Sequence, residues 1–453
     1  MTTRITTENI TDATIGTADL ASSVPLNTQW QSVFVGDGST GLTAVAGRGY
    51  FINTTSGTVT VTLPASPSAG DVVVLKDYAR TWGTNAVTIA SALFDEATRT
   101  QSFSTNGKTV TLVYMDGTKG WSLINEDTTT GLGAQFLSAT GGTITTSGDY
   151  TIHTFTGDAD FVVSSLGNGP TVPVGGPNTV DYLVVAGGGG GGYAGGGGGG
   201  AGGFRVSNTT CMPGPQTSPL SSPTGITVTA TTFPVTVGGG GAPTGSSGSL
   251  GGKGSNSVFS TITSAGGGGG GPNSSPLNPS TDKNGGSGGG AGELNNVSAG
   301  SGNTPPVSPS QGNNGGGAPL NHSGGGGGGA GAVGVNNSGP NSATSVAGTG
   351  GAGSFVLGTG FGGCNGETGP VPGARYFAGG GGGNQNAAGP AGGPGGSGGV
   401  GGGGDGTEKY SGNVPTKSGI ANTGGGGGAG GPNTPSPSGT GGSGIVIIRY
   451  KSS

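Results

Sequence analysis

The residues that could do catalytic chemistry are few in the second half of this 453-residue chain. An enzyme that cleaves glycans needs two carboxyl groups, one as an acid and one as a base or nucleophile. Of the six acids beyond residue 180, only Asp405 and Glu408 are close in sequence, and a surface turn explains both. The two histidines, His153 and His322, have no second ligand at a metal-binding spacing. The sequence therefore predicts no enzyme, no cofactor and no metal site.

A second kind of chemistry is available in the polar stretches that interrupt the glycine-rich half. The segments PNSSPLNPSTDKN, VGVNNSGPNSATSV, NQNAAGPA and PNTPSPS carry many amide and hydroxyl groups. These groups hydrogen-bond equally well to sugar hydroxyls and to protein loops. The same residue types form turns in any protein, so solvated turns are the alternative interpretation. The elements that position these stretches decide between the two.

Composition divides the chain near residue 180, because only 22 of its 115 glycines precede residue 181. Charged residues make up 8% and the net charge is −5, which offers no basic surface for nucleic acid. Apolar runs such as IVII are too short to insert into a membrane, and no secretory signal is expected from the N-terminus. A protein made in a cytoplasm is expected. Cys211 and Cys364 allow one disulfide or two reduced thiols, and the thiols are favoured.

The first 180 residues predict an arm followed by β structure. In RITTENITDATIGTADLAS, Ile and Leu recur every five positions, which is the period of neither a helix nor a strand. Residues 1–28 are therefore expected to be an extended arm for attachment and oligomerisation, with a solvated tail as the alternative. Short alternating runs between turn signals predict an antiparallel, sandwich-like β domain over 29–130. Residues 131–180 continue as a β segment and connector, in which His153 is expected to pack or to face solvent.

The glycine runs repeat a punctuated unit. Each long run is followed by a Pro-, Asn- and Ser-rich stretch and then by a second glycine segment, which a plain linker has no reason to repeat. The long runs begin after Ala186, Ala265, Ser323, Ala378 and Thr423. A polyglycine II helix has about three residues per turn and no internal hydrogen bonds, so neighbouring helices must pair its peptide groups. Residues 181–453 are therefore predicted to form a polyglycine II helix bundle.

Residues 389–406 show a three-residue period. Glycine occupies every third position from 389 to 404, while Ala391, Pro394, Ser397 and Val400 recur with the same period. At about three residues per turn these side chains form one stripe, as expected for a helix with one face outside the bundle.

The ends of the glycine-rich domain indicate a β base. Pairing strand 182–185 with strand 444–450 would anchor both ends of the domain at one place. A single rod through 187–203 would be about 50 Å long, far longer than the other runs, so a turn is predicted at Tyr193-Ala194.

If each glycine run after this turn leads alternately toward and away from the β base, the segments that connect the runs fall into two groups. The polar stretches fall at the distal end and the β-prone strings fall at the base, where 293–322 fits poorly because it is polar. The predicted distal turns are 242–252, 272–284, 333–347, 384–391 and 432–438. The predicted base segments are 204–237, 257–264, 354–377, 405–422 and 445–450.

The residues at both ends of this domain carry a family resemblance. The entry DYLVVAGGGGGG and the exit GGSGIVIIRY resemble the glycine-rich domain of bacteriophage tail-fibre and fibre-tip adhesins, over about residues 140–453. The segments VTVTLPASPSAGD and ITDATIGTADLAS are also similar to modules of phage fibres. In that family, polyglycine helices form a sandwich whose distal loops contact the host receptor. Some relatives lack the long N-terminal part, so this chain would bring its own attachment region.

The resemblance implies a non-enzymatic virion protein, made in the host cytoplasm and assembled as a homotrimer. Its arm would bind other tail proteins, and its distal loops would bind an outer-membrane protein or glycan of the host. The residues assigned to receptor binding are Asn273, Asp282, Lys283, Asn336, Asn337, Asn384, Gln385, Asn386 and Asn433. Two alternatives stay open: a structural fibre on the capsid or baseplate without a receptor, and a polysaccharide depolymerase.

Overall fold

The computed structural model of this protein is mainly β, with four sheets and almost no helix among the described residues. The chain divides into two compact units, residues 1–134 and 135–453. Of the predicted arm, all but Thr28 lies outside the described residues. The structure describes residues 28–124, 135–167, 176–207, 218, 220–222, 224–246, 248–273, 281–293, 298–319, 322–339, 344–357, 361, 363–386, 394–408, 417–431 and 438–452.

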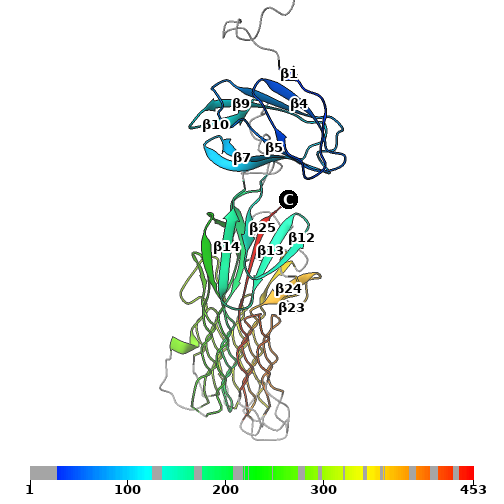
Figure 1. The fold of residues 1–453 in the computed structure, drawn as a ribbon. Helices are drawn as coiled ribbons and strands as arrows, with labels where there is room; N and C mark the ends of the chain where they lie inside the picture. The colour runs from blue at the N-terminus through cyan, green and yellow to red at the C-terminus, as the bar shows by residue number, and fades with distance from the viewer. Residues whose placement is uncertain are drawn as a thin grey trace, which may run out of the picture. The chain divides into compact units, whose positions relative to one another are not determined.

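The first unit is one ten-stranded sheet that curls into a half-barrel (Figure 1). Neighbouring strands follow the order β1-β4-β6-β9-β10-β7-β5-β3, with β2 added beside β4 and β8 beside β7. The strands are β1 (Gln29–Trp30), β2 (Phe34–Val35), β3 (Leu42–Thr43), β4 (Arg48–Asn53), β5 (Val59–Thr62), β6 (Val72–Asp77), β7 (Val87–Phe94), β8 (Ala97–Phe103), β9 (Thr109–Asp116) and β10 (Gly120–Leu123).

Alternating side chains fill the inside of the half-barrel. In β5, Val59 and Val61 are buried while the two threonines beside them face solvent. The core they enter also holds Leu75 and Trp82, neither of which has any exposed surface. The period of two seen in the sequence is thus the period of burial.

The predicted antiparallel, sandwich-like arrangement of the first unit is wrong, because the sheet is single and mixed. Strands β4 and β6 are parallel, as are β5 and β7, whereas β9 and β10 form an antiparallel hairpin. Alternation tells which face of a strand is buried but not the direction of its neighbour. Each of the strands β2 to β5 pairs in parallel with the strand after the next one, and the later strands add the antiparallel pairs.

The second unit gathers three sheets at one end (Figure 1). Their orders are β11-β14-β19-β20-β21, β12-β13-β25-β15-β16-β17 with β18 on β15, and β22-β24-β23. The strands are β11 (Ser138–Thr140), β12 (Thr143–Ser147), β13 (Tyr150–Phe155), β14 (Ala159–Ser165), β15 (Thr179–Val185), β16 (Phe204–Ser207), β17 (Ser221–Ser222), β18 (Ile226–Thr227), β19 (Thr232–Thr236), β20 (Ser257–Phe259), β21 (Ile262–Ser264), β22 (Ser354–Leu357), β23 (Glu367–Thr368), β24 (Ala374–Phe377) and β25 (Ile445–Lys451). A 3-10 turn spans Thr281–Lys283.

The pairing predicted between the first and last strands of the glycine-rich region is confirmed. Strands β15 and β25 run antiparallel, with Leu183 opposite Ile447. One face of the pair enters a core with Phe155 and Phe161, and the other enters a second core with Phe377. Because both faces are covered, these strands are continuously apolar rather than alternating.

The glycine runs extend from this end of the unit, and they are held through their backbones. Three successive N–H groups of residues 187–192 donate to three different neighbouring runs. The next three N–H groups donate to the same three runs in the same order. Their acceptors, in order, are the carbonyl oxygens of Ser255, Gly442, Gly200, Gly252, Gly439 and Gly197. The runs approach so closely that a methyl group on Gly189 would overlap the carbonyl oxygen of Gly268.

Among the described residues no polyglycine II bundle is seen, so the predicted helix type of the glycine runs is not confirmed. The runs contain neither α-helix nor β-strand. A polyglycine II helix has no hydrogen bonds within itself, so nothing along a single run would mark it as helical. What the structure records is the pairing between runs.

The turn predicted at Tyr193-Ala194 is confirmed, because Gly189 pairs with Gly200 and Gly192 with Gly197 across it. The assignment of 293–322 to the base is wrong in part, since the Glu293 N–H donates to the Gly195 carbonyl at the distal turn.

The assignment of 405–422 to the base is wrong in part for the same reason. Thr407 donates to Ala429 near the distal end, and the base reversal lies at Gly401 and Gly402, which have positive φ angles. Two positive-φ glycines reverse the chain there without a strand, so nothing in the residue pattern signals the turn.

Candidate functional site

The candidate site is the distal end of the second unit, where the glycine runs reverse far from the sheets (Figure 1). The first reversal uses Ala194 and Gly195, whose φ angles are 54° and 85°. A side chain on Gly195 would overlap the carboxylate of Glu293, which lies over this turn. The Ala194 N–H donates to Gly430 at 2.8 Å, which ties the turn to another run end.

Asn384 joins two run ends from inside the structure. Its side-chain oxygen accepts the Gly195 N–H at 2.7 Å, and its amide nitrogen donates to the Thr407 carbonyl at 2.5 Å. The residue has no exposed surface. Asn384 therefore caps backbone groups that the runs leave unpaired, and it is not available to a receptor.

Gln385 and Asn337 are also buried, with 2% and 3% of their surface exposed. The Gln385 side chain donates to the Ser345 carbonyl at 3.4 Å. The Asn337 side chain donates to the Ser323 carbonyl at 2.6 Å. Like Asn384, these amides hold neighbouring run ends together.

Asn386 lies at the surface of this cluster and is half-buried. Its amide nitrogen donates to the Glu293 carboxylate at 3.0 Å, and its backbone N–H donates to the His322 carbonyl at 2.7 Å. Glu293 and His322 are also half-buried. Asn386 thus brings the Glu293 carboxylate and its own side-chain amide together at the distal end, and its backbone ties them to His322.

Asp282 and Lys283 lie partway along the runs rather than at the distal end. The Asp282 carbonyl accepts the N–H of Gly269, in the middle of run 265–272. Asp282 is exposed, whereas Lys283 is buried and donates to the Ser298 carbonyl at 2.8 Å. Burial lowers the pKa of Lys283 below its ordinary value. Its ammonium group therefore serves the fold.

The remaining predicted residues differ in accessibility. Asn336 is exposed, and its side-chain oxygen accepts the Gly317 N–H at 2.7 Å. Asn273 is half-buried after the distal end of run 265–272. Asn433 lies outside the described residues. Accessible groups at the distal end are thus those of Asn336, with Asn273 and Asn386 partly accessible.

Sequence reasoning missed Glu293, His322 and Thr407 as members of this cluster. Glu293 and Thr407 each directly follow the distal end of a glycine run, as Tyr193 does after 187–192, whereas His322 is separated from its run by Ser323. For Glu293 and Thr407, the available signal was their position as the first non-glycine residue after a run; His322 carried no such signal.

Of the two neighbouring acids Asp405 and Glu408, the first is held by structural contacts. The Asp405 carboxylate forms an ion pair with Lys417 at 2.7 Å and accepts the Gly398 N–H at 2.8 Å. Burial acts to raise the pKa of Asp405, but the hydrogen bonds from Lys417 and Gly398 together hold it below the ordinary value. A general acid needs a raised pKa, so Asp405 is placed as a structural ion-pair partner.

The described residues offer neither a metal-binding cluster nor a membrane-spanning helix. They contain no group of three or more His, Cys, Asp or Glu side chains that would hold a metal ion. They also contain no helix with the length and apolar character needed to cross a membrane. Cys364 is a free, exposed thiol, and Cys211 lies outside the described part of the chain.

The chain matches a known domain family. The profile of a glycine-rich domain family matches residues 164–451. None of the curated proteins compared with the chain matches it.

Proposed function

The chain belongs to the glycine-rich domain family over residues 164–451, and from that premise we propose that it is a bacteriophage tail-fibre protein that binds the host cell surface. The receptor-binding part is the distal end of the second unit. The N-terminal arm, residues 1–28 of the first unit, binds other tail proteins. The protein acts in the virion as a homotrimer, after synthesis in the host cytoplasm.

The scaffold of this function is a polyglycine II bundle, and the hydrogen bonds of run 196–203 support it. The N–H groups of 197–203 donate in rotation to runs 265–272, 324–330 and 424–431. Their acceptors, in order, are Gly271, Gly325, Gly427, Gly268, Gly328, Gly424 and Ala265. A threefold rotation of donors is what a helix with about three residues per turn produces.

The carbonyl groups of the same run support the bundle as well. They accept N–H groups from three other runs, 187–192, 286–292 and 379–384. Run 196–203 therefore pairs with six neighbours through its backbone alone. Packing this close favours glycine, because a methyl group at most positions of run 196–203 would overlap the backbone of the next run, and the one alanine there, Ala201, is fully buried.

The three-residue stripe in 394–400 is a further support. Pro394 and Ser397 are exposed, whereas Gly396 and Gly399 are buried. Side chains on one face and bare backbone on the other are expected for a threefold helix at the edge of a bundle.

The single observation that carries the receptor-binding role is the separation of the two ends of the second unit. The apolar strands gather at one end, and the reversals with Asn336, Asn386 and Glu293 lie at the other. A rigid scaffold that presents polar connectors at one end is typical of binding proteins. Amides, hydroxyls and one carboxylate suit sugar hydroxyls or the loops of an outer-membrane protein.

The test uses the purified full-length chain and envelope fractions of candidate hosts. Binding to outer-membrane protein or lipopolysaccharide is measured by pull-down and by surface plasmon resonance. The expected result is saturable binding that the double variant Asn336→Ala, Asn386→Ala weakens about tenfold or more, as when two direct hydrogen bonds are lost. Thr145→Ala, exposed on β12 among the sheets, is the matched control and leaves binding unchanged.

Two results would contradict the proposal. Absence of binding to any envelope fraction of a host that the phage infects would favour a structural fibre without a receptor. Release of reducing ends from host polysaccharide would favour a depolymerase instead.

A further inference from the structure

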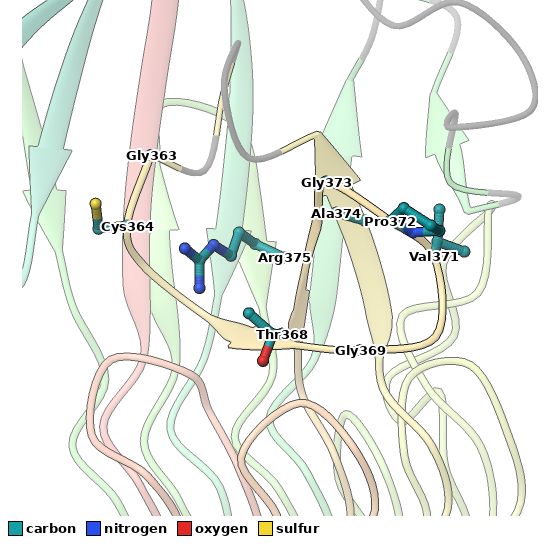
Figure 2. A pocket seen from close by; sticks show the side chains of 9 residues that line it. All are labelled: Gly363, Cys364, Thr368, Gly369, Val371, Pro372, Gly373, Ala374 and Arg375. Atoms are coloured by element: carbon teal, nitrogen blue, oxygen red, sulfur yellow. The ribbon is translucent and has the colours of Figure 1, made fainter.

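A hollow of about 460 Å³ lies beside the β23–β24 hairpin, in the sheet end of the second unit (Figure 2). Its lining includes Cys364, Thr368, Val371, Pro372, Ala374 and Arg375. Glycines complete the wall, so the backbone itself is accessible at several points. The volume falls within the range of about 300–1,000 Å³ that small-molecule sites occupy.

Arg375 supplies a cation to this hollow. It lies directly opposite Thr368 in the antiparallel pair β23–β24, so both side chains stand on the same face of the hairpin. Figure 2 shows the guanidinium group extending across the loop, between Cys364 and Thr368. Arg375 is half-buried and Thr368 is exposed, so both can meet a ligand from solvent.

No acid of the described chain is seen to neutralise this guanidinium. The acid of the hairpin is Glu367, which is next to Thr368 in the strand and therefore faces the opposite side. Its carboxylate accepts the N–H groups of Gly401 and Gly402, both at 2.7 Å. Among the described residues, no hydrogen bond or ion pair of the Arg375 side chain is found.

The other walls set the kind of ligand. Val371 and Pro372 give apolar surface, and Thr368 adds a hydroxyl that both donates and accepts. A bare oxyanion would use the guanidinium and leave the apolar wall in water. A ring with a carboxylate and several hydroxyls uses all three kinds of surface.

We propose that the hollow beside the β23–β24 hairpin binds an acidic saccharide, with the Arg375 guanidinium paired to its carboxylate and Thr368 bonded to a ring hydroxyl. Guanidinium and carboxylate match as two parallel hydrogen bonds, which fixes the orientation of the sugar. This site lies at the sheet end of the unit. It is independent of the receptor binding proposed for the distal end.

The test is binding of glucuronate to the full-length chain, measured by ligand-observed NMR and calorimetry at constant ionic strength. We expect glucuronate to bind and glucose to bind at least about tenfold more weakly, because it lacks the charged partner of Arg375. Arg375→Gln is expected to weaken glucuronate binding about 10- to 100-fold, and Arg375→Lys to retain part of it. Thr368→Val is expected to weaken it by a smaller factor, about two- to tenfold.

The matched control is Arg205→Gln, which removes a half-buried arginine of β16 away from the hollow and leaves binding unchanged. Circular dichroism and the unfolding midpoint establish that each variant is folded. Equal binding of glucose and glucuronate, or unchanged binding in Arg375→Gln, would overturn the proposal. Acetate or inorganic phosphate binding as tightly as glucuronate would overturn the assignment to a saccharide.

Discussion

The two units of this protein are stabilised by different groups. The first unit buries apolar side chains such as Ile52, Leu75 and Trp82 inside one curled sheet. In the runs of the second unit, the buried residues are mostly glycines, and the groups in contact are mostly backbone N–H and C=O. The first unit thus depends on the hydrophobic effect, and the runs depend on hydrogen bonds between peptide groups.

The comparison teaches which substitutions each unit tolerates. A core of side chains is damaged when atoms are removed, because a cavity remains. A packing of bare backbones is damaged when atoms are added, because no space is left for them. Alanine is therefore the destructive residue in both units, for opposite reasons.

The largest expected effect is from Leu75→Ala in the first unit. Leu75 has no exposed surface, and its truncation is expected to cost about 2–5 kcal/mol of unfolding free energy. Differential scanning calorimetry is expected to show the transition of the first unit at a lower temperature and that of the second unit unchanged. A shift of both transitions by the same amount would contradict the independence of the two units.

Gly189→Ala is the converse change in the second unit. The added methyl group would overlap the carbonyl oxygen of Gly268, and the expected cost is about 1–3 kcal/mol, carried by the second transition. The control is Gly239→Ala, since Gly239 is exposed and a methyl group there meets nothing within 4 Å. Gly239→Ala is expected to be neutral or to stabilise by up to about 1 kcal/mol. Equal effects of the two variants would mean that close approach of the runs does not matter.

Much of the second unit could be predicted from its sequence, because local patterns carry its two main features. The apolar strings at 182–185 and 444–450 predict the central strand pair, and the length of the first run predicts the turn at Tyr193. The half-barrel of the first unit could not be predicted, because parallel pairing between β4 and β6 depends on crossovers that no local pattern records.

The candidate site was harder to predict than the fold. Polar residue type identified Asn384, Gln385 and Asn337, but all three are consumed in pairing backbone groups. Whether an amide faces solvent or a neighbouring run depends on which runs end beside it, which is a property of the three-dimensional packing. Glu293 was passed over because it stands alone in its segment.

A pH change is expected to affect the second unit alone. His153 has no exposed surface, and burial lowers its pKa below the ordinary value of 6.5 although the Gly141 carbonyl, 2.7 Å from its Nδ1, acts to raise it. The unfolded chain therefore takes up the proton first as pH falls. The stability that neutral His153 contributes is therefore present above about pH 6.5, and it is lost as pH falls through the pKa of His153 in the folded protein. The first unit, residues 1–134, contains no histidine and is expected to keep its transition between pH 7 and 5.

The measurement is the midpoint of each calorimetric transition between pH 7 and 5. His153→Gln is the matched variant, and it is expected to flatten the pH dependence of the second transition. A dependence that persists undiminished in His153→Gln would assign it to other groups.

The smallest expected effect is from Asp405→Asn, which removes a charge from the outside of the runs. The Asp405–Lys417 pair is largely exposed, with 42% and 67% of the two side chains accessible, so the expected cost is below about 1 kcal/mol. Asparagine keeps the oxygen that accepts the Gly398 N–H, so the variant isolates the charge. Because the pKa of Asp405 lies below its ordinary value of 3.8, the difference from wild type is expected above that pH and disappears as pH falls through the folded pKa.

Lys417→Met removes the same pair from the other side, and 1 M salt should weaken it in the wild-type chain. Both variants leave intact the bond from the Gly428 N–H to the Lys417 carbonyl, at 3.0 Å. If the glycine runs are held by backbone groups, losing the ion pair costs less than the one methyl group added in Gly189→Ala. A larger cost from Asp405→Asn, measured by denaturant unfolding at pH 7, would show that side-chain charges hold the runs and would reverse the comparison between the two units.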